Sequence, residues 1–184
     1  MKLLCFVLVL TLPALAQSPA PPDNDYVHQQ FGDTCSLDPQ FKPMVGDLNG
    51  DGIEDLVLVA RCTNPLMDQD EKNFRVIDPL NSFYGYGDTR ITSGFGQSDP
   101  RLKGISLLIV QGAGAESWRA SQPQAKFLVI NIAVKSASLK RMRLRKKKSV
   151  AAIYVEEANA DGSTGAIFWD GRKYKYEPMG SGLD

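Results

Sequence analysis

The pattern of apolar and polar positions along the chain predicts several β-strands and few helices. Unbroken apolar runs rich in β-branched residues are typical of strands that are covered on both faces. An Asp-Gly pair at 170–171, between an apolar run and alternating Lys and Tyr residues, predicts a hairpin. The predicted strands lie at 53–60, 74–77, 105–110, 126–134 and 149–157, and the predicted hairpin at 165–178.

Helical patterns are scarce by comparison. Residues 26–31 predict at most one helical turn, and the segment between the strands at 105–110 and 126–134 has room only for a short helix. Residues 81–100 are rich in glycine and aromatic residues and predict a long loop, whose role the sequence does not assign. We therefore expect a mainly β single domain over 26–184, with a largely antiparallel sheet and one or two short helices. An α+β arrangement is the alternative.

The first residues predict an export signal. Lys2 provides a positive start, 3–12 form an apolar run, and Ala14-Leu15-Ala16 matches a small-residue cleavage site, so we expect a signal peptide over 1–16. The apolar run is shorter than the about 20 residues that cross a bilayer as a helix. The proline-rich residues 17–25 then predict a disordered lead. These features predict a secreted or periplasmic protein without a transmembrane segment in the mature chain.

The two cysteines outside this predicted signal peptide favour a disulfide. Cys35 and Cys62 form an even pair in a chain expected to be exported, where thiols pair by default. The alternative is two separate buried thiols.

The segment GDLNGDGIEDLVL, residues 46–58, carries the most specific chemistry. Like charges this close repel each other unless a cation lies among them, and alternating side-chain oxygens with a turning glycine suit calcium, which takes six to eight oxygen ligands. Ile53 adds a backbone carbonyl. The candidate ligands within the loop 47–55 are Asp47, Asn49, Asp51, Ile53 and Asp55. The alternative is a solvated acidic turn without a metal.

This segment resembles the calcium loop of FG-GAP/VCBS-type repeats, in which matching residues of a loop between antiparallel strands hold calcium. An EF-hand is excluded because its twelfth position requires a glutamate, whereas the chain has Leu58 there. Propellers need several repeats, and a second start at Glu157, Asn159 and Asp161 reaches Gly165 where a carboxylate is needed. The resemblance therefore implies a stand-alone domain with one structural calcium ion.

Charge is balanced overall, with a formal net charge of zero, but it is distributed unevenly. The segment 140–148 holds seven bases and no acid. In its first part, basic residues alternate with Met142 and Leu144. This pattern predicts an edge strand whose charges oppose edge-to-edge aggregation. The alternative is a surface for an anionic polymer or for the cell envelope; nucleic acid is not favoured, because aromatic residues are missing from the run. The basic residues are Lys140, Arg141, Arg143, Arg145, Lys146, Lys147 and Lys148.

Enzyme signatures are sparse. His28 is the only histidine, and neither a nucleophile motif nor a phosphate-binding loop is found. The sequence therefore favours a calcium-binding interaction module with a protein or carbohydrate ligand. A secreted calcium-dependent hydrolase that uses Asp88, Asp99 and aromatic residues of the 81–100 loop is the rival, and polyanion binding through 140–148 is the third hypothesis.

Overall fold

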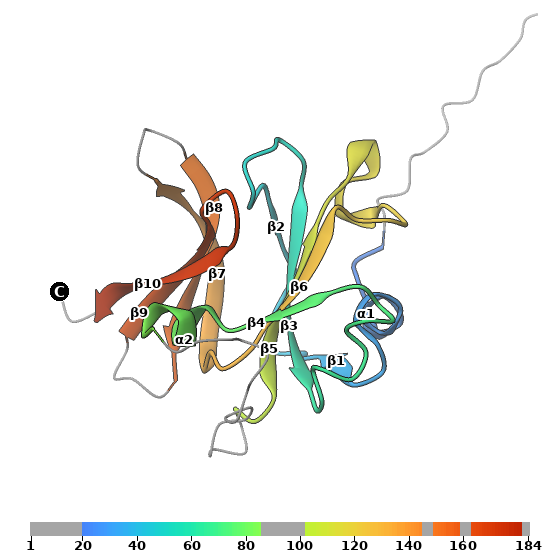
Figure 1. The fold of residues 1–184 in the computed structure, drawn as a ribbon, viewed down its shortest axis with the longest axis horizontal. Coiled ribbons are helices and arrows are strands. Elements are labelled where there is room, and N and C mark those ends of the chain that lie inside the picture. Colours follow the sequence, from blue (N-terminus) through green and yellow to red (C-terminus); the bar gives the residue numbers. More distant parts are fainter. Residues whose placement is uncertain (1–19, 86–101, 145–148, 159–162, 182–184) are drawn as a thin grey trace, which may run out of the picture.

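Two β-sheets face each other across an apolar core (Figure 1). The computed structural model describes residues 20–85, 102–144, 149–158 and 163–181. One sheet contains β1 (Cys35–Leu37), β2 (Met44–Gly46), β3 (Asp55–Cys62), β4 (Arg75–Ile77), β5 (Ile105–Gln111) and β6 (Ala125–Val129). The other contains β7 (Val134–Arg143), β8 (Ser149–Glu157), β9 (Ser163–Trp169) and β10 (Tyr174–Ser181).

The strand order confirms the expected mainly β, largely antiparallel fold. The six-stranded sheet runs β1-β3-β5-β6-β4, with β2 also paired to β3, and the four-stranded sheet runs β10-β9-β8-β7. Only β4 and β6 pair in parallel among the described strands, so the larger sheet is mixed. The hairpin predicted around Asp170 and Gly171 is formed by β9 and β10.

The larger sheet is covered on both faces, which explains the unbroken apolar runs in β3 and β5. On one face, Val57, Val59 and Ile109 pack toward Ile153 and Ile167 of the four-stranded sheet. On the other, Leu56, Leu58 and Leu108 belong to a second cluster that includes helix α1. Alternate residues of one strand point to opposite faces, so both faces must be apolar.

Helix α1 (Asn24–Phe31) closes the outer face of the larger sheet with Val27 and Phe31, both fully buried. Asp23 caps it, because its carboxylate accepts a hydrogen bond from Tyr26 N at 2.9 Å. The helix is longer than the predicted turn at 26–31. It also includes the last two residues of the segment 17–25, for which a disordered lead was predicted.

The prediction of one strand over 126–134 is wrong. β6 ends at Val129, and the chain then crosses to the other sheet, where β7 begins at Val134. Asn131 takes a positive φ of 64° at this crossing, and its amide donates to the buried carboxylate of Asp78 at 2.5 Å. Ile132 and Ala133 are buried like strand residues, so hydrophobicity alone did not reveal the break.

Two short helices lie between strands. α2 (Pro79–Phe83) packs on β10 and is capped by Asp78, whose carboxylate accepts from Asn81 N at 2.9 Å. The 3-10 helix η1 (Gly114–Arg119) follows β5 and buries Trp118. η1 is the short helix expected between the two strongest strands.

The disulfide between Cys35 and Cys62 is confirmed, with a sequence separation of 27 residues. The two cysteines face each other on adjacent strands β1 and β3. The described part of the chain contains no helix long and apolar enough to cross a membrane. The predicted signal peptide, most of the 81–100 loop and Arg145–Lys148 lie outside the described residues.

Candidate metal centre

The acidic loop joins β2 to β3 and turns tightly around the carboxylate of Asp47. Asp47 Oδ1 accepts hydrogen bonds from Gly50 N at 2.6 Å and from Asp51 N at 3.1 Å, and Oδ2 accepts from Gly52 N at 3.0 Å. Gly50 and Gly52 have φ values of 77° and 86°, a region that glycine occupies without strain. The glycines therefore allow three backbone N–H groups to surround one carboxylate.

Asn49 and Asp51 extend this pattern on the exposed side of the loop. The Asn49 side-chain oxygen accepts from Asp51 N at 3.0 Å, and Asp51 Oδ1 accepts from Ile53 N at 2.8 Å. The Asn49 amide nitrogen donates to Asp51 Oδ2 at 2.9 Å and to Gln124 Oε1 at 2.9 Å. The amide N–H of Asn49 thus stabilises the carboxylate of Asp51 by a hydrogen bond.

Asp55 is the first residue of β3, and its side chain is fully buried. Oδ2 accepts from Leu48 N, at the start of the same loop, and Oδ1 accepts from Gly112 N, just after β5, each at 2.8 Å. Burial raises the pKa of Asp55 to about 6, against the lowering effect of these N–H groups, and the charge of Asp51 raises it further. Asp55 therefore ties both ends of the loop to the neighbouring strand.

The loop is also attached to the four-stranded sheet. Ala151 N on β8 donates to the backbone carbonyl of Asp47 at 3.1 Å. Gly46 lies so close to β7 and β8 that an added Cβ would be 3.1 Å from Leu139 Cδ1 and 3.5 Å from Ala151 Cβ. The spacing of residues in the loop does not reveal that Gly112, Gln124 and Ala151 support it, because each comes from a strand or turn distant in sequence.

The donor chemistry of the loop suits a hard cation. Asp47, Asn49, Asp51, Asp55 and the carbonyl of Ile53 are all oxygen donors of the kind that calcium takes. Within the described residues, however, no group of three or more His, Cys, Asp or Glu side chains is arranged to hold a metal ion. The carboxylates are directed at backbone N–H groups instead, so calcium stays a prediction from the sequence.

The suggested second loop starts at Glu157, and its remaining residues Asn159 and Asp161 lie outside the described part of the chain. Glu157 is buried and accepts a hydrogen bond from Tyr176 OH at 2.5 Å. Gly165 lies in β9 directly under the ring of Tyr176, where a Cβ would collide with ring atoms. Glycine at this position therefore serves packing between β9 and β10.

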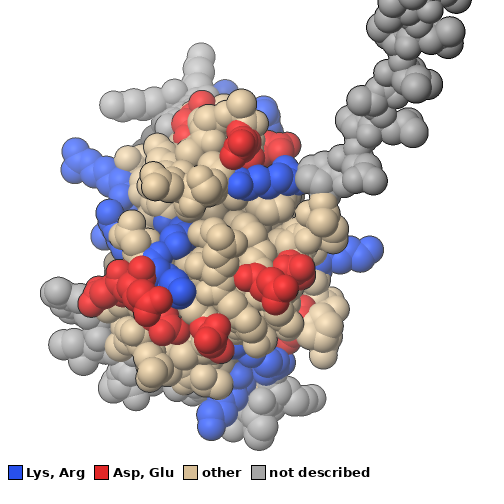
Figure 2. All heavy atoms as spheres, turned by 90° about the vertical axis from the view of Figure 1, so that its right-hand side faces the viewer, with Lys and Arg blue, Asp and Glu red and all other residues tan. Residues whose placement is uncertain are grey.

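The first part of the basic segment forms the edge strand β7, as predicted. Lys140, Arg141 and Arg143 are exposed on it, and Lys140 Nζ lies 5.3 Å from the ring centroid of Tyr154. Met142 and Leu144 pack against a small cluster of Val150, Ala152 and Phe168. The face of the molecule that carries α1 looks different: acidic and basic groups are interspersed there (Figure 2).

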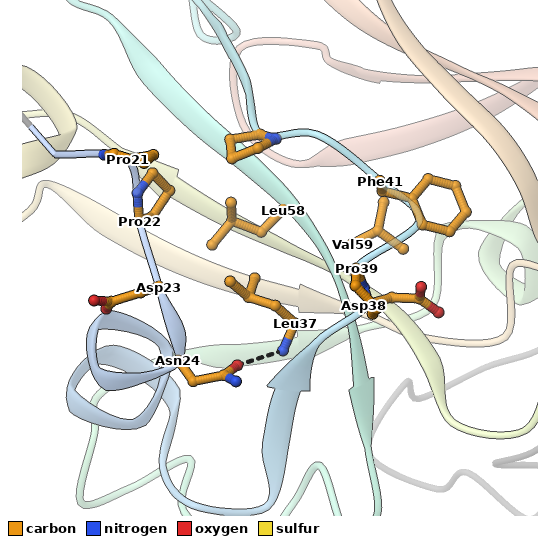
Figure 3. Close-up of a pocket in the computed structure, with 11 residues that line it drawn as sticks. Pro21, Pro22, Asp23, Asn24, Leu37, Asp38, Pro39, Phe41, Leu58 and Val59 are labelled. Carbon is orange, nitrogen blue, oxygen red and sulfur yellow. Dashed lines mark hydrogen bonds between the residues drawn. The ribbon is translucent and has the colours of Figure 1, made fainter.

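A cavity of about 480 Å³ lies at the start of α1, away from the acidic loop (Figure 3). Apolar side chains that include Pro22, Leu37 and Phe41 line it. Asn24 Oδ1 accepts from Leu37 N at 2.8 Å on one side, and the carboxylate of Asp38 is paired with Arg61 at 3.0 Å on another. The polar groups of its wall are thus occupied by structural contacts.

Comparison of the chain with protein-family models, with curated proteins and with solved structures finds no significant match. The resemblance to FG-GAP/VCBS repeats therefore rests on residues 46–58 alone.

Proposed function

We propose that the protein is an exported calcium-binding β-domain that serves as an interaction module, in which calcium has a structural role. The observation that carries this proposal is the conformation of the 47–55 loop. The loop backbone wraps around the carboxylate of Asp47 and donates hydrogen bonds to it. The carboxylate of the buried Asp55 accepts a hydrogen bond from the residue that follows β5. Export is supported by the disulfide between Cys35 and Cys62, since disulfides persist in oxidising compartments.

Calcium would be held by the side chains of Asp47, Asn49, Asp51 and Asp55 and by the carbonyl of Ile53. Its positive charge would offset the repulsion among the carboxylates of Asp47, Asp51 and Asp55. The contact between the Asn49 amide nitrogen and Asp51 Oδ2 competes with this role, because both side chains are engaged there with each other. Ion binding replaces that contact.

The loop forms hydrogen bonds with both sheets, so an ion bound in it would stabilise the whole domain. Asp55 reaches Gly112 beside the larger sheet, and the carbonyl of Asp47 accepts from Ala151 of the smaller sheet. At a calcium concentration tenfold above Kd, binding stabilises the folded state by about 1.4 kcal/mol. For a chain of this size, that corresponds to a rise of roughly 3 to 6 °C in melting temperature.

Thermal unfolding of the parent chain and of Asp51→Ala, in calcium and in EDTA, tests the proposal. The parent should melt several degrees higher in calcium, whereas Asp51→Ala should melt at the same temperature in both buffers. Asp33→Ala is the matched control, because Asp33 is an exposed acid outside the loop, and it should keep the calcium response. A parent chain that melts identically in both buffers contradicts a structural calcium ion.

The rival hypothesis of a hydrolase has less support within the described residues. Asp88 and Asp99 lie outside them. His28 lies on α1 with its Nδ1 3.9 Å from Asp33 Oδ1. The polar residues Asp23, Asn24 and Asp38 in the wall of the cavity beside α1 are engaged in structural contacts. A binding module therefore accounts better for the described surface.

A further inference from the structure

The end of β7 and the turn between β9 and β10, which are distant in sequence, bring basic side chains to one end of the four-stranded sheet. β7 ends with Arg141 and Arg143, which lie opposite Ala151 and Ser149 of β8. Because Ile153 of β8 lies opposite Ile167 of β9, the turn after Trp169 extends beside the first residues of β8. This turn carries Arg172 and Lys173.

We call Lys140, Arg141, Arg143, Arg172 and Lys173 the basic end. It crosses the width of the sheet from β7 to β10, about 14 Å for three strand spacings. The four residues that connect β7 to β8 lie outside the described part of the chain, and the basic end is defined without them.

The charges of the basic end are available for a partner. All five side chains are exposed, and the described residues include no ion pair with any of them. The acid of the β9–β10 turn, Asp170, is already engaged: its carboxylate pairs with Lys175 at 2.8 Å and accepts from Arg172 N and Lys173 N. None of the five bases is therefore paired with an acid among the described residues.

Apolar groups lie beside one of these charges. Met142 and Leu144 share the outer face of β7 with Lys140 and are only partly buried against Val150 and Phe168, whereas Arg141 and Arg143 point to the opposite face. An exposed end of a sheet meets a flat partner more readily than it encloses a thin polymer. The bilayer interface accepts both cationic and apolar side chains, and a lipid surface presents many anionic headgroups at once.

We propose that the basic end docks the protein on a lipid surface that contains anionic headgroups. This site shares no residue with the calcium loop, so its lipid binding can be measured without calcium. Each base close to such a surface strengthens binding about fivefold. The attraction is electrostatic, so it falls off within a Debye length and weakens as salt is added.

Co-sedimentation of the full chain with vesicles tests the proposal. Phosphatidylcholine vesicles with and without phosphatidylglycerol are compared, in EDTA and in low salt, so that failure of calcium binding does not affect the result. The parent chain should bind the anionic vesicles and not the neutral ones. Arg172→Gln/Lys173→Gln should bind them about 25-fold more weakly, given about fivefold for each base.

The control variant Lys42→Gln/Lys103→Gln removes the same charge from exposed positions on the larger-sheet side of the chain. It should bind like the parent. Equal losses in both double variants would overturn the proposal, because they would show a response to net charge and not to a defined surface. Binding to a sulfated polysaccharide without binding to anionic vesicles would also overturn it, in favour of a polymer partner.

Discussion

The carboxylate of Asp55 shows how one side chain defines the acidic loop. It is fully buried, and each of its oxygens accepts a backbone N–H, one from Leu48 and one from Gly112. A carboxylate can accept at both oxygens, whereas an amide presents a donor at one of them. Position 55 therefore requires a side chain whose two terminal atoms both accept hydrogen bonds.

We expect Asp55→Asn to destabilise the fold by about 2 to 3 kcal/mol even without metal, because a buried N–H would face a second donor. Urea unfolding in EDTA measures this loss. Asp51→Asn is the matched control, since Asp51 is exposed and the same change there should cost much less. Equal losses for the two variants would show that the buried contacts of Asp55 are not decisive.

A second carboxylate, Asp170, predicts how stability depends on acid. Its partial burial raises the pKa, but hydrogen bonds from Lys175 and from the N–H groups of Lys173 and Arg172 outweigh this and hold the pKa at about 2. The ordinary value is 3.8. A lowered pKa in the folded state means that ionised Asp170 stabilises the fold above the ordinary pKa, and that this contribution is lost as the pH falls through about 2.

Replacement of Asp170 by asparagine should therefore lower stability at neutral pH and make stability less sensitive to pH between about 4 and 2. Unfolding in urea at a series of pH values measures both effects. A variant that loses stability as steeply as the parent over this interval would contradict the assigned role of Asp170.

At the scale of elements, the pairing of β9 with β10 depends on glycine. Gly165 lies opposite Pro178 and under the ring of Tyr176. An aromatic ring that covers a glycine on the neighbouring strand fixes the register of the pair. The same residue is the one that departs from the calcium-loop pattern in the second acidic segment.

We expect Gly165→Ala to destabilise the domain by about 1 to 3 kcal/mol, because the added methyl group displaces the Tyr176 ring. A double-mutant cycle with Tyr176→Ala tests the cause. The cost of Gly165→Ala should largely disappear when the ring is absent. Additive losses would show that the strain lies elsewhere.

The disulfide joins β1 to β3 and closes a segment that contains the whole acidic loop. For a loop of this length, the chain-entropy model gives about 3 to 4 kcal/mol. Cys35→Ser/Cys62→Ser should lose about that much stability in urea unfolding. A loss below about 1 kcal/mol would contradict the chain-entropy account at this site.

Local patterns predicted the strong strands and the β9–β10 hairpin, because a turn signal or an unbroken β-branched run determines each of them. They did not predict β1 or β2, which are three residues each, or the crossing at Asn131. β1 and β2 depend on pairing with β3, and the crossing depends on contacts across the core. Tertiary context overrides local preference there.

The same holds for the candidate site. The sequence identified Asp47, Asn49, Asp51, Ile53 and Asp55 through their spacing. It did not identify the residues that hold the loop, because Gly112, Gln124 and Ala151 act through backbone or amide groups. The sequence also did not predict that Arg172 and Lys173 lie near Arg143, because that proximity arises from the strand order in the sheet.

At the scale of the whole molecule, the two sheets share one core and meet again at the acidic loop. The loop hydrogen-bonds to β8 through Asp47 and to the end of the larger sheet through Asp55. The basic end lies close to it, because Ala151, the partner of Asp47, is also the residue opposite Arg141. The domain therefore combines, at one end, an acidic loop suited to a cation and bases suited to an anionic surface.

Isothermal titration of calcium into the metal-stripped full chain decides whether the acidic loop binds the ion. We expect a binding heat that fits one site and that is lost in Asp51→Ala. Absence of heat in the parent chain, together with elemental analysis that finds no retained ion before stripping, would contradict calcium binding. The loop would then be an acidic turn that its own backbone N–H groups stabilise.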